Sequence, residues 1–152
     1  MSDLLGLEGT IPLPMYVASL EGRVLAGNQP LADLLRLEGP DQLIGLSTKR
    51  FYLNPDRYTK ENQRRRNEEG LFVGKIHMRR QDGSLCVVLD HSYLRDDPRY
   101  GRVVVGWMTD ITHEEERAHQ KRRLYRNGWD MTHEMFLVFD CQGRFLDANQ
   151  AT

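Results

Sequence analysis

Few side chains of this sequence are placed to do chemistry together. The nearest approach to a metal-ligand cluster is His113, Glu114 and His119, in a segment rich in glutamate and arginine. Zinc-binding helices carry two histidines four residues apart on one face, whereas histidines six residues apart lie on different faces. No serine or cysteine has a readable pairing with a histidine base. The sequence therefore predicts no catalytic residue and no metal site.

The composition indicates a globular protein without a polyanionic partner. Of the 152 residues, 39% are hydrophobic and 28% are charged, and the formal net charge is -1. A nucleic-acid-binding domain normally has a basic excess, so the charge argues against that class. No apolar run approaches the ~18 residues of a membrane-spanning helix, and no signal peptide pattern opens the chain. Cys86 and Cys141 form no CxxC pair, which favours a reducing, cytoplasmic location.

The first half of the chain predicts a hairpin followed by helices. Short apolar runs at 15–19 and 23–26 flank a glycine turn, which is typical of two paired strands. Asn28 is a good N-cap for a short helix that we expect to end near residues 39–40. An Asn-Pro pair then opens a second, very polar helix, predicted over residues 55–70.

The second half predicts a three-stranded meander. Residues 72–79 alternate between apolar and polar side chains, which indicates a strand with one buried face. The Asp-Gly pair within 81–84 suits a hairpin turn, so 85–94 is expected to be the partner strand. A polar loop over 95–101 would then lead to a third strand at 103–108.

A charged helix is expected after the last strand. Thr112 and Glu115 have the spacing of a capping box, and Asn127-Gly128 is a stop signal. The few apolar residues between them predict a solvated connector, or a helix that pairs along a thin seam. Together the elements predict an α+β fold, with a five-stranded antiparallel sheet, short helices on one face and a C-terminal linker helix.

Four segments, in order along the chain, resemble a PAS domain of a bacterial multidomain sensory protein. They read SLEGRVLAGN at 19–28, FYLNPDR at 51–57, GKIHMRRQDGS at 74–84 and GWMTDITHEEER at 106–117. The last is similar to the G-x-x-x-D-I-T-E-R ending of many bacterial sensory PAS domains. The order and spacing of all four carry the resemblance.

The resemblance implies a sensory and dimerisation module of a signal-transduction protein rather than an enzyme. In the family, the Asp-Ile-Thr segment couples the sheet to the helix that follows, and Asp110, Ile111 and Thr112 match it. The implied partners are a second copy of the chain, paired through the PAS domain and linker helix, and neighbouring PAS and output domains. The output domain would be a histidine kinase or cyclic-dinucleotide cyclase. A ligand-free interaction domain, a small ligand-binding enzyme and a haem sensor stay open as alternatives.

The opening motif recurs near the end of the chain. GRFLDANQA at 143–151 repeats GRVLAGNQP at 22–30, with an offset of 121 residues. We interpret the second copy as the start of another PAS domain, cut before a core can form, in a tandem sensor protein. The expected parts are a lead-in segment, a PAS sensory domain, a linker helix with its connector and a truncated second PAS domain, at residues 1–14, 15–112, 113–134 and 135–152.

The sequence requires no cofactor, and whether a small molecule binds stays open. The best-known haem-binding members use a histidine from the helices before the third strand, and residues 48–74 contain none. Neither Cys86 nor Cys141 has the N-C-R-F context of covalent flavin binding, so haem and covalent flavin are both disfavoured. The inward face closes as a filled core or leaves a cavity for a small ligand. The pocket candidates are Tyr52, Ile76, Met78 and His91.

Overall fold

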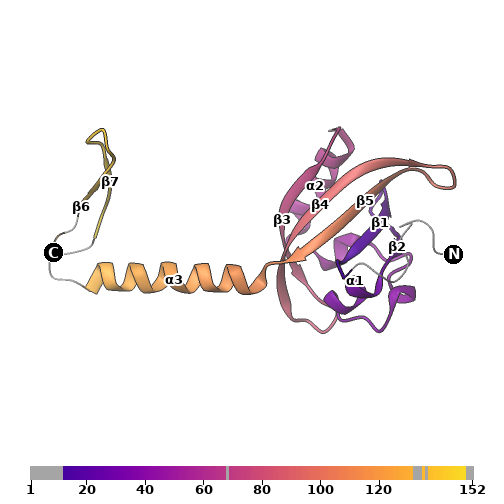
Figure 1. Cartoon of the computed structure of the whole chain (residues 1–152), viewed down its shortest axis with the longest axis horizontal. Coiled ribbons are helices and arrows are strands. Elements are labelled where there is room, and N and C mark those ends of the chain that lie inside the picture. Colours follow the sequence, from indigo (N-terminus) through magenta and orange to yellow (C-terminus); the bar gives the residue numbers. More distant parts are fainter. Residues whose placement is uncertain (1–11, 68, 132–134, 136, 150–152) are drawn as a thin grey trace. The chain divides into compact units, whose positions relative to one another are not determined.

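The protein is described by a computed structural model over residues 12–67, 69–131, 135 and 137–149. The chain divides into two compact units, with the boundary between Thr112 and His113. The first unit holds a five-stranded antiparallel sheet with its helices, and a two-stranded hairpin belongs to the second (Figure 1). The α+β architecture predicted from the sequence is therefore confirmed. Of the expected lead-in segment, residues 1–11 lie outside the described ranges.

The sheet brings the first strand of the chain beside the last. Its strands are β1 (Met15–Ser19), β2 (Val24–Gly27), β3 (Phe72–Arg79), β4 (Leu85–Asp97) and β5 (Gly101–Asp110). Their order in space is β2-β1-β5-β4-β3. Two tight turns make β3, β4 and β5 a local meander, and β1 then pairs with β5 so that Tyr16 lies opposite Gly106. The sheet is therefore completed by a strand pairing between residues 90 positions apart, which no local sequence pattern specifies.

Both predicted asparagine caps are present, at helices that end earlier than expected. The helices are α1 (Gln29–Leu34), the 3₁₀ turns η1 (Pro40–Gln42) and η2 (Thr48–Phe51), and α2 (Pro55–Asn67). The Asn28 side chain accepts from the Leu31 amide at 3.1 Å, and Asn54 accepts from the first two amides of α2. α1 stops at Leu34 because Arg36 takes a left-handed φ of 60°, which no α-helix continues.

The core lies between α1 and the inner face of the sheet. Ile76 and Met78 of β3 are buried, whereas His77 between them is exposed, as the predicted alternation requires. The leucines of α1 pack against this face in one continuous cluster. The inner face is therefore the one that faces the helices, and it is the place to look for a ligand site.

Two further predicted boundaries were wrong. The polar loop expected over 95–101 is a three-residue turn, because β4 runs to Asp97 and β5 begins at Gly101. The Asp97 carboxylate accepts from two amides of this turn, at 2.8 and 3.0 Å, which holds the long strands together at their tip. The linker helix α3 (Thr112–Met131) passes through the expected stop at Gly128. A glycine inside a helix costs only about 1 kcal/mol, so the stop signal is weak.

The hairpin of the second unit repeats the first hairpin of the chain. Its strands are β6 (Leu137–Phe139) and β7 (Phe145–Ala148). Every pairing in it is the β1–β2 pairing shifted by 121 residues, including a register shift at the corresponding position, as Tyr16↔Gly27 and Leu137↔Ala148 illustrate. The sequence repeat is thus also a repeat of backbone structure. That β6 and β7 begin a second domain remains a prediction.

Candidate functional site

An apolar cavity lies inside the first unit, between α1 and the sheet. Its volume is about 40 Å³, and the residues around it include Leu31, Leu35, Leu43, Phe51, Met78 and Val104. A single water needs ~10–15 Å³ measured in this way, so there is room for about three water-sized groups. Ser19, Thr48 and Asn62 add a few polar side chains. A small, mostly apolar molecule is the kind of ligand that such a space accepts.

The four pocket candidates from the sequence fall in different places. Tyr52 and Met78 line this cavity. The Tyr52 hydroxyl donates to Glu61 at 3.3 Å, so its polar end is held by α2. Ile76 is 1% exposed and belongs to the packed core, outside the cavity lining.

His91 lies on the other face of the sheet. It alternates along β4 with the buried residues Asp90 and Ser92, and its ring stacks on Trp107 with centroids 5.2 Å apart and planes 2° from parallel. It therefore contributes no polar group to the cavity. The register of β4 could not be fixed from the sequence, because both faces of residues 85–89 are apolar.

A buried carboxylate stands at the centre of the inner face. Asp90 is fully buried, and the Tyr16 hydroxyl lies 3.0 and 3.2 Å from its two oxygens, so this donor spans both. The Tyr16 ring can cross β5 to reach β4 only because Gly106 has no side chain: a Cβ there would lie 2.4 Å from the ring. Sequence reasoning missed this group. An inward charged residue would have signalled it, but the sequence left open which face of β4 is inward.

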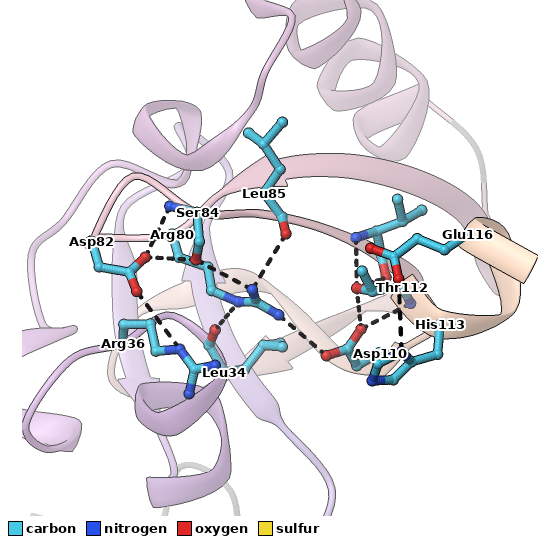
Figure 2. A network of polar contacts seen from close by, with 11 residues as sticks. Leu34, Arg36, Arg80, Asp82, Ser84, Leu85, Asp110, Thr112, His113 and Glu116 are labelled. Atoms are coloured by element: carbon cyan, nitrogen blue, oxygen red, sulfur yellow. Dashed lines mark hydrogen bonds and ion pairs between the residues drawn. The ribbon is translucent and has the colours of Figure 1, made fainter.

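The Asp-Ile-Thr segment joins the end of β5 to the start of α3 (Figure 2). Thr112 is the first residue of α3, rather than the residue before it, and its hydroxyl accepts from the Val87 amide of β4 at 3.1 Å. Its own amide and hydroxyl both donate to the Asp110 carboxylate. The Ile111 amide donates to the Val87 carbonyl at 2.9 Å. All three residues named from the sequence therefore take part in tying the helix start to the sheet.

Arg80 connects this junction to the end of α1 (Figure 2). Its guanidinium donates to the Leu34 carbonyl at 3.0 Å and to Asp110 at 3.4 Å. The next amide along, that of Gln81, donates to the Leu35 carbonyl at 2.9 Å. Only 12% of the Arg80 side chain is exposed, whereas the Asp110 side chain is 41% exposed, so the contact with Leu34 is partly buried and the contact with Asp110 faces water. Sequence reasoning missed Arg80, because its partners come from three separate elements.

Hydrogen bonds and burial also shift two pKa values near Arg80. The Ser84 hydroxyl and amide donate to Asp82 and lower the pKa of that exposed carboxyl below 3.8, with a smaller contribution from Arg36. Burial raises the pKa of the Cys86 thiol above 9.0. Within the part of the chain that the structure describes, no three His, Cys, Asp or Glu side chains gather as metal ligands. No described helix is both long and apolar enough to cross a membrane.

The comparisons with known proteins rest on structure. No protein-family model matches the chain, and no curated protein does. Three solved structures illustrate the matches that structure gives. The PAS domain of a protein from Colwellia psychrerythraea is 20% identical, with 68% of this chain and 89% of that chain covered at a TM-score of 0.60.

The other two come from different kinds of protein. The PAS domain of an HTR-like protein from Haloarcula marismortui is 17% identical, with 67% and 84% covered at a TM-score of 0.58. The PAS domain of a LuxR-family transcriptional regulator from Burkholderia thailandensis, in complex with ethanol, is 19% identical, with 67% and 91% covered at a TM-score of 0.55. At these identities the likeness concerns the fold. The five-stranded unit of this chain therefore has the PAS fold that the sequence resemblance predicted.

Proposed function

We propose that the chain is a sensory module that relays the state of its apolar cavity to α3. The observation that carries the proposal is Arg80, which bonds both to the end of α1 and to Asp110. Leu31 and Leu35 of that α1 region line the cavity, and Asp110 binds the first residue of α3. A molecule that displaces α1 would thus pull on the same side chain that orients the helix start.

The energies involved suit a switch. A hydrogen bond with a charged partner is worth about 1.5–3 kcal/mol where it is shielded, as between Arg80 and Leu34, and about 0.2–1 kcal/mol where it faces water, as between Arg80 and Asp110. Allosteric coupling energies are typically about 1–3 kcal/mol, so making or breaking one Arg80 bond is enough to bias two arrangements of the junction. Downstream, we propose that α3 passes the change to an output domain of histidine kinase or cyclic-dinucleotide cyclase type.

The ligand we propose for this cavity is a small, largely apolar molecule. A volume of about 40 Å³ is too small for haem or a flavin and suits a compound of a few heavy atoms. The Burkholderia thailandensis PAS domain in complex with ethanol is an example of that size class within the same fold. Tyr52 and Met78 are the candidate contacts that line the space.

A second candidate function, as a ligand-free interaction domain, is favoured by the outer face of the sheet. Val73 and Tyr93 are 50% and 38% exposed there, beside the stacked pair of His91 and Trp107. We propose that this face and α3 pair two copies of the chain in the cytoplasm. Native mass spectrometry of protein purified from cells separates the candidates, because a bound small molecule supports sensing and a bare dimer supports interaction alone.

The relay is tested by a double substitution, Asp110→Asn with Thr112→Ala, in a form of the protein that includes its output domain. The fold should survive, because both positions lie at the edge of the unit, and the response of the output to the signal should be lost. The matched control is Asp96→Asn with Thr109→Ala, at exposed positions of β4 and β5. Normal switching by the first variant would refute the relay.

A further inference from the structure

We propose that a second cavity, beside β4, binds the ammonium group of a small primary amine. This cavity has a volume of about 20 Å³, and Glu69, Phe72, Ser92 and Leu94 are among its lining residues. A water molecule needs ~10–15 Å³, and an ammonium group is about the same size. The cavity therefore has room for such a head group, with the carbon chain directed toward the exposed residue Glu69.

Ser92 supplies the first polar contact. It is 1% exposed, and its hydroxyl oxygen has no hydrogen-bond partner among the described residues. A buried hydroxyl normally bonds to protein or to ordered water, so an unsatisfied one marks a place where a polar group is expected. The oxygen has two acceptor lone pairs, which suit an N–H donor of the ligand.

A carboxylate favours a cation in this cavity. Asp90 lies two residues before Ser92 on the same face of β4, roughly 6–7 Å along the strand, and is fully buried. The Glu69 carboxylate in the lining attracts an ammonium group and repels a carboxylate or phosphate ligand, whereas the Asp90 carboxyl lies outside the lining and is bonded by the Tyr16 hydroxyl.

The Phe72 ring forms a wall of the cavity that also favours a cation. It folds over Gly74, where a Cβ would lie 2.8 Å from two ring atoms, and Gly74 is paired with Asp90 across the strands. The Arg64 guanidinium carbon lies 5.8 Å from the ring centroid, so the ring does attract a cation, and the positive charge of Arg64 acts against a second one there. Aromatic faces attract ammonium groups, so the ring and the Glu69 carboxylate act in the same direction.

Binding is measured directly by amide NMR on this chain with three probes of similar size: ethylamine, ethanol and propionate. We expect saturable shifts for ethylamine at the amides of Ser92 and its neighbours, with a Kd of about millimolar because so small a ligand offers few contacts. Ethanol should bind roughly tenfold more weakly at this cavity, and propionate should not bind. Equal shifts from ethylamine and ethanol, or none that saturate, would mean that Ser92 binds only a water and would overturn the proposal.

Two substitutions locate the site. Glu69→Gln should abolish the preference for ethylamine over ethanol, and Ser92→Ala should weaken ethylamine binding roughly tenfold. Asp96→Asn, which removes an exposed carboxylate of the same strand, should change neither. Ser92→Ala with unchanged ethylamine affinity is by itself enough to refute the site. The inference goes beyond the proposed sensory function, because the relay starts from the other cavity: binding without any effect on output would leave both the site and the relay intact.

Discussion

Replacing Gly106 with alanine should destabilise the protein far more than an ordinary glycine substitution. The new Cβ would lie 2.4–2.5 Å from three atoms of the Tyr16 side chain, a separation that packed atoms do not adopt. The tyrosine ring must therefore shift, and its hydroxyl leaves the two oxygens of the buried Asp90.

The magnitude follows from three contributions. Loss of a hydrogen bond to a buried charged group costs about 1.5–3 kcal/mol, and overpacking costs about 1–3 kcal/mol. Alanine regains about 0.5–1 kcal/mol over glycine in a strand interior. The free energy of unfolding of Gly106→Ala should therefore fall by about 2–5 kcal/mol.

Urea denaturation measures this change, and Gly39→Ala is the control. Gly39 has an extended φ of −165°, and the nearest atom to its added Cβ is 4.0 Å away, so the cost should stay within about 0.5 kcal/mol. The hydrogen bond is isolated by repeating Gly106→Ala in a Tyr16→Phe background, where the alanine should cost about 1.5–3 kcal/mol less. A loss below about 1 kcal/mol, or equal losses in both backgrounds, would refute the packing argument.

Two further predictions concern the groups with shifted pKa values. The folded pKa of Asp82 lies below its unfolded value, so its contribution to stability is present above the unfolded pKa and is lost as pH falls through the folded pKa. Ser84→Ala should raise the folded pKa of Asp82 toward 3.8 in an NMR titration, because the hydroxyl that stabilises the carboxylate is removed. An unchanged pKa would refute the assigned cause. An alkylating agent at about pH 8 should label the exposed Cys141 and spare Cys86, because burial raises the pKa of the Cys86 thiol. Mass spectrometry of the labelled peptides measures this difference, and equal labelling of the two cysteines would contradict it.

Local chemistry predicted the elements of this fold well. The N-caps at Asn28 and Asn54 and the turn at 81–84 are written in two to four adjacent residues, and the structure has all of them. The alternation over 72–79 gave the correct buried face for the same reason. The boundary at Gly128 failed because a single weak helix breaker is outweighed by the helix around it.

Local sequence patterns could not predict the contacts between distant segments of the chain. Arg80 is one of several arginines near the hairpin turn, and only its position opposite α1 and Asp110 distinguishes it. Asp90 could be recognised as an inward carboxylate only after the register of β4 was known. The undetermined register of β4 also explains why His91 was a pocket candidate, because a shift of one residue moves a side chain to the other face of the sheet. The resemblance to PAS domains did give the Asp110–Thr112 junction, because that segment is contiguous.

The relay from cavity to helix is tested most directly by amide exchange in the second turn of α3. The amides of residues 116–119 bond to carbonyls of the first turn, so their exchange reports how firmly the helix start is held. Trimming the cavity wall with Leu35→Val should change these exchange rates at least severalfold when Arg80 is present. In an Arg80→Gln background the same trimming should leave them unchanged. Equal changes in both backgrounds would contradict the claim that Arg80 carries the signal.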